Sequence, residues 1–332
     1  WQVFATHPPL QERIRRVDPR WDGQFIQRKP RHYARAPRSR QDSEAGVGRA
    51  AIATAAILAG VEAAQSESEV DADFVATPAP DLEADTASQQ GIPVAYVRHS
   101  HEPLGAQALV CSLLMASEAE VRGQQLAILA DSGIRGLAEL VNTLSPGVLE
   151  LGAPRRLPLL EMCLPALKAM SLRQYRAFKG NLLQLIQADT RTELHEWCLF
   201  QLVRHYLDPE FIQVKPSRSR YRRLQQVADH LRVTLSVLAH EGSGETDFVF
   251  RHGADELGFT DMQLVPLEHC SVAAFSRAVH ELAHCYPLLK PRILKALALA
   301  ASADGRLNPS EREIIASMAA VMDCPVPMAL DG

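Results

Sequence analysis

One short pattern occurs twice in this chain and constrains its fold more than any other feature. It reads Ala-Asp-x-Arg-x-x-x-x-Glu, and the two copies span residues 188–196 and 303–311. Each copy joins an apolar run before it to another apolar run after it. An internal repeat indicates a supersecondary unit used more than once, and a polar turn between two apolar runs predicts a helix–turn–helix in each copy.

The second copy contains the residues that begin a helix. Asn308 suits the N-cap and Pro309 suits the first helical position. Glu311 follows at the position from which a carboxylate can reach back to the cap, so we predict a capping box. In the first copy Thr190 stands where the second has Gly305, so the first copy is the weaker match.

The second copy resembles the turn of TerB-like, tellurite-resistance-type, all-α domains. The resemblance rests on Ala303-Asp304-Gly305-Arg306, on the glutamate-containing helix start that follows, and on the helix end Met322-Asp323-Cys324-Pro325. It implies an all-α domain over residues 104–329 with two TerB-like halves, about 104–215 and 216–329.

The acids of the two copies have two interpretations. Asp304 and Glu311 in the second copy, with Asp189 and Glu196 in the first, can be turn and cap residues that bond to nearby backbone groups. Alternatively they hold a cation, which would make the domain a cation-responsive adaptor. We favour the first interpretation, because the spacing lacks the alternating Asp and Asn ligands of an EF-hand loop.

Composition favours a helical region with a substantial core. Hydrophobic residues make up 47% and aromatic residues 6% of the chain, with abundant Ala and Leu. The net charge of -4 argues against a dedicated nucleic-acid binder. The six cysteines show no C-x-x-C spacing, so we expect free thiols in a reducing compartment. The chain opens on Trp1 without an initiator Met, and we expect it to be part of a longer protein.

The N-terminal residues carry a second resemblance. The string Thr6-His7-Pro8-Pro9-Leu10-x-Glu12-Arg13-Ile14, continued to Gly23, is similar to the C-terminal end of the catalytic domain in HtpX-like membrane zinc metallopeptidases. It implies that residues 1–27 end such a domain and that the zinc-binding core lies upstream. It also implies that His7 lies near that zinc site and that Arg13 holds the loop. Otherwise His7 merely precedes a proline turn.

Residues 28–103 are expected to form a mostly disordered linker. The stretch from Arg28 to Arg40 is basic and contains no acid, which suits a solvated linker or a contact with acidic lipid headgroups. A short Ala-rich helix is expected near 47–65, too short to cross a bilayer. From Ser66 to Gln90, acids, Ser, Thr and Pro follow no periodicity.

Leucines recur at helical spacing over most of residues 104–329, which predicts an all-α fold of stacked helical pairs. One helix is predicted to start at Ser117-Glu118-Ala119-Glu120, and the further predicted helices cover 133–143, 156–170, 172–187, 194–206, 217–240, 271–286, 288–303 and 309–322. Tyr221 lies among four arginines, which we interpret as the solvated start of the 217–240 helix and not as a nucleic-acid patch.

His280-Glu281-x-x-His284 fits the H-E-x-x-H pattern of zinc peptidases. On a helix the two imidazoles share a face and can bind zinc, with Glu281 placed to deprotonate its water and Glu311 or Glu313 as a third ligand. The core stripe of the same helix, however, is predicted to run through Phe275, Ala278, Val279, Leu282 and Tyr286. The three motif residues then fall on a solvated face.

We therefore expect the non-catalytic interaction or regulatory region of an HtpX-like enzyme, on the cytoplasmic side of an inner-membrane-anchored parent. Its partners would be the upstream peptidase domain in cis and a protein substrate or membrane protein, with no nucleic acid. No cofactor is expected in this region, and zinc is implied only for the parent. A self-contained peptidase using His280, Glu281 and His284, and the cation-responsive adaptor, are the alternatives.

Overall fold

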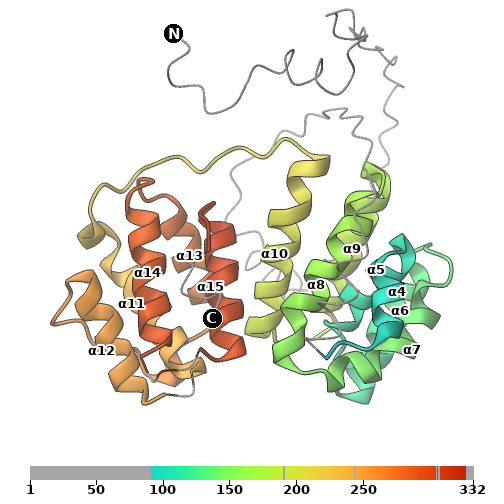
Figure 1. Cartoon of the computed structure of the whole chain (residues 1–332), viewed down its shortest axis with the longest axis horizontal. Coiled ribbons are helices and arrows are strands. Elements are labelled where there is room, and N and C mark those ends of the chain that lie inside the picture. The colour runs from blue at the N-terminus through green and yellow to red at the C-terminus, as the bar shows by residue number, and fades with distance from the viewer. Residues whose placement is uncertain (1–90, 190, 243, 304, 306, 327–332) are drawn as a thin grey trace, which may run out of the picture. The chain divides into compact units, whose positions relative to one another are not determined.

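The computed structural model describes residues 91–189, 191–242, 244–303, 305 and 307–326, and within these ranges the regular elements are all helical (Figure 1). They comprise twelve α-helices and two short 3₁₀ helices, which confirms the all-α prediction. In this part of the chain no helix is long and apolar enough to cross a membrane. The segment 1–27, His7, Arg13, the Arg28–Arg40 run, the Ala-rich stretch near 47–65 and Asp304 lie outside the described residues.

The first group of helices surrounds α5. Every residue of α5 from Gly105 to Ser112 is buried, because its small and apolar side chains encircle the helix and α4, α7 and α8 pack against it. The helices of this group are α4 Val94–Ser100, α5 Pro103–Ser112, α6 Ala119–Asp131, α7 Leu137–Glu150, α8 Ala153–Lys168, α9 Leu172–Gln187 and α10 Leu194–Phe211.

The second group is arranged around α11, which packs against α12, α13, α14 and α15. Its elements are η1 Leu224–Val227, α11 Ala228–Glu241, α12 Thr246–Leu257, η2 Leu267–His269, α13 Val272–Ala283, α14 Leu289–Ala301 and α15 Pro309–Val321. Helix α12 was not predicted. Its buried residues include Val249, Phe250 and Leu257, but charged residues separate them.

Both copies of the repeated pattern lie between two helices, α9 and α10 in the first case and α14 and α15 in the second. The predicted capping box of α15 is confirmed, since the Asn308 N–H donates to Glu311 Oε2 at 2.8 Å. The first copy has an equivalent box, in which the Glu193 N–H donates to Glu196 Oε2 at 2.8 Å. The same sequence pattern therefore begins two helices in the same way.

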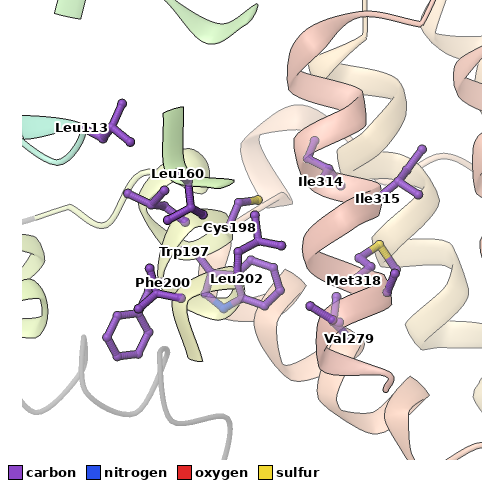
Figure 2. Packing of buried hydrophobic residues seen from close by; sticks show 14 of the residues in the cluster. Leu113, Leu160, Trp197, Cys198, Phe200, Leu202, Val279, Ile314, Ile315 and Met318 are labelled. Atoms are coloured by element: carbon purple, nitrogen blue, oxygen red, sulfur yellow. The ribbon is translucent and has the colours of Figure 1, made fainter. Parts of the chain in front are cut away.

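The helices that follow the two turns pack on each other and join the two groups (Figure 1). Figure 2 shows side chains of this seam: Trp197 and Leu202 come from α10, and Ile314 and Met318 from α15. Each is almost completely buried, and Trp197 also meets the edge of Phe275 on α13, with ring centroids 5.1 Å apart. Burial of an aliphatic side chain of this size contributes about 1.5–3 kcal/mol, so the seam is a substantial part of the core.

Several expected helix boundaries differ from the structure: the helix expected over 133–143 is α7 Leu137–Glu150, and the one expected over 271–286 is α13 Val272–Ala283. Residues 217–223 are not helical: the Arg220 and Tyr221 N–H groups both donate to the His284 carbonyl, which holds this strip in an extended form against the end of α13. Helical structure also begins at Val94, inside the range expected to be linker. The buried side chains of Ile92 and Val97 pack into the core there, in a run too short to show periodicity.

Candidate functional site

A cleft of about 370 Å³ opens where α10 and α15 begin. Its walls come from both groups of helices: α8 and α10 on one side, α11, α13 and α15 on the other. The polar side chains that matter for its chemistry are Arg156, His195, Cys198, Glu241, Ser310 and Glu313. The cleft is therefore built at the seam that the repeated pattern creates.

The two copies of the pattern contribute equivalent positions to this cleft. Counted from the helix caps Glu193 and Asn308, His195 and Ser310 are the second helical residues, and Cys198 and Glu313 are the fifth. Residues three apart lie on one face of a helix. Each capping box therefore presents the same two positions to the cleft, while the third position holds the capping glutamate.

Glu313 is the most unusual group in the cleft. Its side chain is only 3% exposed, and Oε2 accepts a hydrogen bond from Arg156 Nη1 at 3.2 Å. Oε1 is buried and has no hydrogen-bond partner among the described residues. Burial raises the pKa of this carboxyl to about 7, although the charge and hydrogen bond of Arg156 pull it down. Near neutral pH the group is therefore poised between its charged and neutral forms.

His195 stands opposite with a neutral imidazole. Burial and the nearby charge of Arg156 lower its pKa to about 4. Its Nδ1 lies 3.0 Å from Glu193 Oε2. A carboxylate can only accept, so the proton of the neutral ring belongs on Nδ1, and Nε2 is left as an acceptor.

Cys198 is not an activated thiol. Burial, reinforced by the charge of Glu313, raises its pKa well above the ordinary value, and the Ser317 hydroxyl lies 3.2 Å from Sγ. Nucleophilic cysteines instead have a lowered pKa and partial exposure. The cleft thus holds an acid with a raised pKa, a neutral histidine and a thiol that burial keeps protonated.

A smaller hollow of about 190 Å³ shares Arg156, Glu193 and His195 with the cleft. Two residues of the first copy, Asp189 and Glu196, line it. Burial raises the pKa of Glu196 to about 8, against the hydrogen bond from the Glu193 N–H that lowers it.

Of the two acids named in the second copy, only Glu311 lies within the described residues. Glu311 is buried at the start of α15, where its carboxylate caps the helix and lies against Gly242, leaving no room there for a Cβ. Asp304 lies outside the described residues. A cation held between Asp304 and Glu311 therefore stays an untested alternative to the cap role.

The H-E-x-x-H residues lie at the end of α13, with His284 as its C-cap. Four residues of the predicted core stripe, Phe275, Ala278, Val279 and Leu282, are buried, whereas Tyr286 lies beyond the end of α13 and is only partly buried. The opposite face is less solvated than expected, because His280, Glu281 and His284 are all partly buried.

Each of these three side chains has a specific contact. His280 Nδ1 lies 2.8 Å from the Ser276 carbonyl, and His284 Nδ1 lies 3.0 Å from the Arg218 carbonyl. Glu281 Oε2 accepts from the Tyr221 hydroxyl at 2.6 Å. Within the described ranges no three His, Cys, Asp or Glu side chains, Glu311 and Glu313 among them, are grouped so as to hold a metal ion. In the described part of the chain, His280 and His284 therefore have no third ligand of these types grouped with them.

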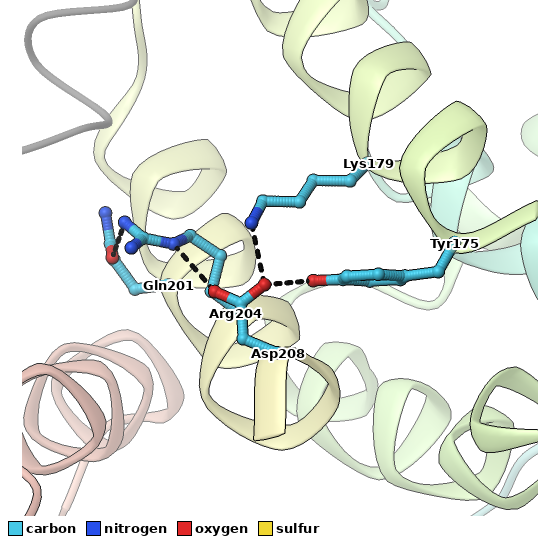
Figure 3. Close-up of polar contacts among 5 residues, drawn as sticks. All are labelled: Tyr175, Lys179, Gln201, Arg204 and Asp208. Atoms are coloured by element: carbon cyan, nitrogen blue, oxygen red, sulfur yellow. Dashed lines mark hydrogen bonds and ion pairs between the residues drawn. The ribbon is translucent and has the colours of Figure 1, made fainter. Parts of the chain in front are cut away.

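A separate polar cluster ties α9 to α10 (Figure 3). Asp208 is buried, and its carboxylate accepts from the Tyr175 hydroxyl at 2.5 Å, from Lys179 Nζ at 2.6 Å and from Arg204 Nε at 3.3 Å. Tyr175 also stacks on Phe211, with ring centroids 4.4 Å apart. Lys179 and Arg204 thus share the one carboxylate of Asp208, which suits a structural clamp between the two helices.

The sequence indicates Glu313 as a possible metal ligand, but it does not predict the cleft at the start of α10 and α15. One signal was available: Glu313 shares a helical face with Ile314, Ser317 and Met318, so an acid stands on an otherwise buried stripe. Arg156 gives no comparable local signal, because it meets Glu313 only in the folded chain.

Comparisons with known proteins identify no relative. The chain matches no protein-family profile, no curated protein and no solved structure.

Proposed function

We propose that this chain is the non-catalytic interaction and regulatory region of an HtpX-like membrane zinc metallopeptidase, with two TerB-like halves. In this proposal the zinc belongs to an upstream peptidase domain. The partner, either that domain in cis, a protein substrate or a membrane protein, binds at the cleft between α10 and α15. The N-terminal and C-terminal resemblances support the family assignment.

One observation carries the binding role. The cleft is lined by both helix groups and holds a buried carboxylate oxygen with no partner among the described residues. Unpaired buried polar atoms are rare in folded proteins and call for an explanation, and a ligand that arrives later is one. Because its walls come from both groups, a partner bound there would favour one packing of α10 on α15. That is a physical route to regulation.

The test is site-specific photo-crosslinking in the full chain. A benzoylphenylalanine at Ser310, on the cleft wall, is compared with one at Arg251, an exposed residue of α12 outside the cleft. We expect a defined partner to crosslink at position 310 and not at 251, and the purified partner to bind Glu313→Gln at least tenfold more weakly. Equal crosslinking at both positions, or unchanged affinity, would refute the proposal.

The alternative of a self-contained zinc peptidase has weaker support. Both motif imidazoles direct Nδ1 at a backbone carbonyl, an orientation that metal-binding histidines also use. A catalytic zinc site needs three protein ligands, however, and the described residues do not bring a third to His280 and His284.

A further inference from the structure

We infer that the cleft binds an organic cation, an ammonium or guanidinium group, whose N–H donates to Glu313 Oε1. This inference rests on the proposed function and names the chemistry of the ligand. It does not require a metal, and it assigns one atom of the chain as the receiving group.

The first step is the hydrogen-bonding requirement. Glu313 Oε2 is already bound to Arg156, while Oε1 is buried without a partner in the described chain. When Glu313 is ionised, its oxygens only accept hydrogen bonds, so the missing partner of Oε1 in that form is a donor. Arg156 shows that a guanidinium fits one edge of this carboxylate, and charge-assisted bonds of this kind are the strongest available.

The second step is charge. The cleft is lined by the carboxyl groups of Glu193, Glu241 and Glu313 and by a single guanidinium, that of Arg156. His195 adds no charge at neutral pH, because its pKa is lowered to about 4. With Glu313 ionised, the lining has an excess of negative charge, which disfavours an anion and favours a cation.

The third step is size and surface. A volume of about 370 Å³ exceeds the needs of a bare ion and falls in the range of small-molecule sites. Leu194, Val272 and Ile314 supply an apolar part of the wall. A methylene stem can lie along such a wall while its charged end reaches a carboxylate, as arginine and lysine side chains do.

The same cation can arrive on a protein partner or as a free amine. We assign it to an arginine or lysine side chain of the partner, because the proposed function is protein binding. A free polyamine offers the same ammonium chemistry without a peptide, and the test separates the two.

The test measures binding to the full chain by calorimetry and by amide chemical shifts at Leu194 and Ser310. The probes are an arginine-containing pentapeptide, the same peptide with citrulline, and spermidine. We expect the arginine peptide to bind, the citrulline peptide to bind at least tenfold more weakly, and spermidine to bind more weakly than the arginine peptide. Spermidine binding best would overturn the assignment to a protein side chain. Equal binding of arginine and citrulline, or no shift at either amide, would overturn the inference.

The variants keep the result interpretable. Glu313→Gln should weaken the arginine peptide at least tenfold, whereas Glu268→Gln, an exposed acid outside the cleft, should not. If Glu313→Gln fails to fold, Glu241→Gln on the exposed wall replaces it, and unchanged binding there counts against the inference. A partner that crosslinks at position 310 without any preference for arginine over citrulline would sink this inference and leave the proposed function standing. If the arginine peptide binds the cleft but no partner protein crosslinks specifically at position 310, the proposed function fails and the cation-binding chemistry of the cleft stands.

Discussion

The buried carboxyl of Glu313 should make the stability of this chain depend on pH in a way that one substitution removes. Its ordinary pKa is 4.5, and in the folded chain burial raises the pKa to about 7. The folded state therefore holds this proton more tightly than the unfolded state. The stability that this group contributes is present below pH 4.5 and is lost as the pH rises through 7. Between pH 5 and pH 7.5 the linkage relation gives a loss of about 2 kcal/mol.

Other titratable groups near Glu313 also affect how the stability of the chain changes with pH. Arg156 on α8 lowers the pKa of Glu313. The other acidic groups that line the cleft are Glu193, Cys198 and Glu241. His195 titrates in the opposite sense, because its pKa is lowered to about 4 and its contribution is lost as the pH falls below 6.5. It is present in wild type and variant alike, so its contribution largely cancels when the two are subtracted.

The assay is urea unfolding of the wild-type chain and of Glu313→Gln at pH 5, 6 and 7.5. Glutamine resembles the protonated acid in shape, so the two proteins should differ least at pH 5. By pH 7.5 the variant should gain about 2 kcal/mol relative to wild type. Glu268→Gln, at an exposed acid, is the matched control and should show no such trend. A difference between Glu313→Gln and wild type that stays within about 0.5 kcal/mol over this range would refute the reasoning.

Three further predictions test other parts of the structure. Asp208→Asn should lower the free energy of unfolding by about 3 kcal/mol, because Lys179 and Arg204 lose their carboxylate partner; a loss below about 1 kcal/mol in urea unfolding would contradict the clamp. Gly105→Ala should lower the free energy of unfolding by about 1–3 kcal/mol, because a Cβ there overlaps the backbone of His99. Gly123→Ala, in open space on α6, should raise it by up to about 1 kcal/mol. Equal effects of the two substitutions in thermal unfolding would be inconsistent with the α4–α5 contact. After metal-free dialysis the full chain should retain no stoichiometric zinc by elemental analysis, and a His280→Ala, His284→Ala variant should not differ. One zinc per chain, lost in that variant, would restore the peptidase alternative.

The features that the sequence predicted correctly depend on neighbours along the chain. The capping box of α15 involves only Asn308 and Glu311, three residues apart, so its geometry follows from local spacing. The buried stripe of α13 through Phe275, Val279 and Leu282 follows from helical periodicity in the same way. In both cases every participant lies within a few turns of one helix.

The features that the sequence missed depend on distant partners. Residues 217–223 were expected to be helical, but the backbone of Tyr221 finds its partners at His284 and Tyr286. The Arg156–Glu313 pair joins α8 to α15. Neither the extended strip nor this pair has a periodic signature, because each forms only when distant segments pack.

Comparing equivalent positions in the two copies separates the residues that begin the helices from those that can differ between α10 and α15. Glu196 and Glu311 both close a capping box, so that position is needed to begin the helix and is the same in both copies. The fifth helical position takes no part in the capping box, and it is Cys198 in α10 but Glu313 in α15. Two cysteines there would leave both fifth positions uncharged, and two glutamates would place like charges together at the seam. A single acid at this position therefore gives the cleft a buried acceptor without a second buried charge. This asymmetry supports a binding role for the cleft that the repeat itself does not require.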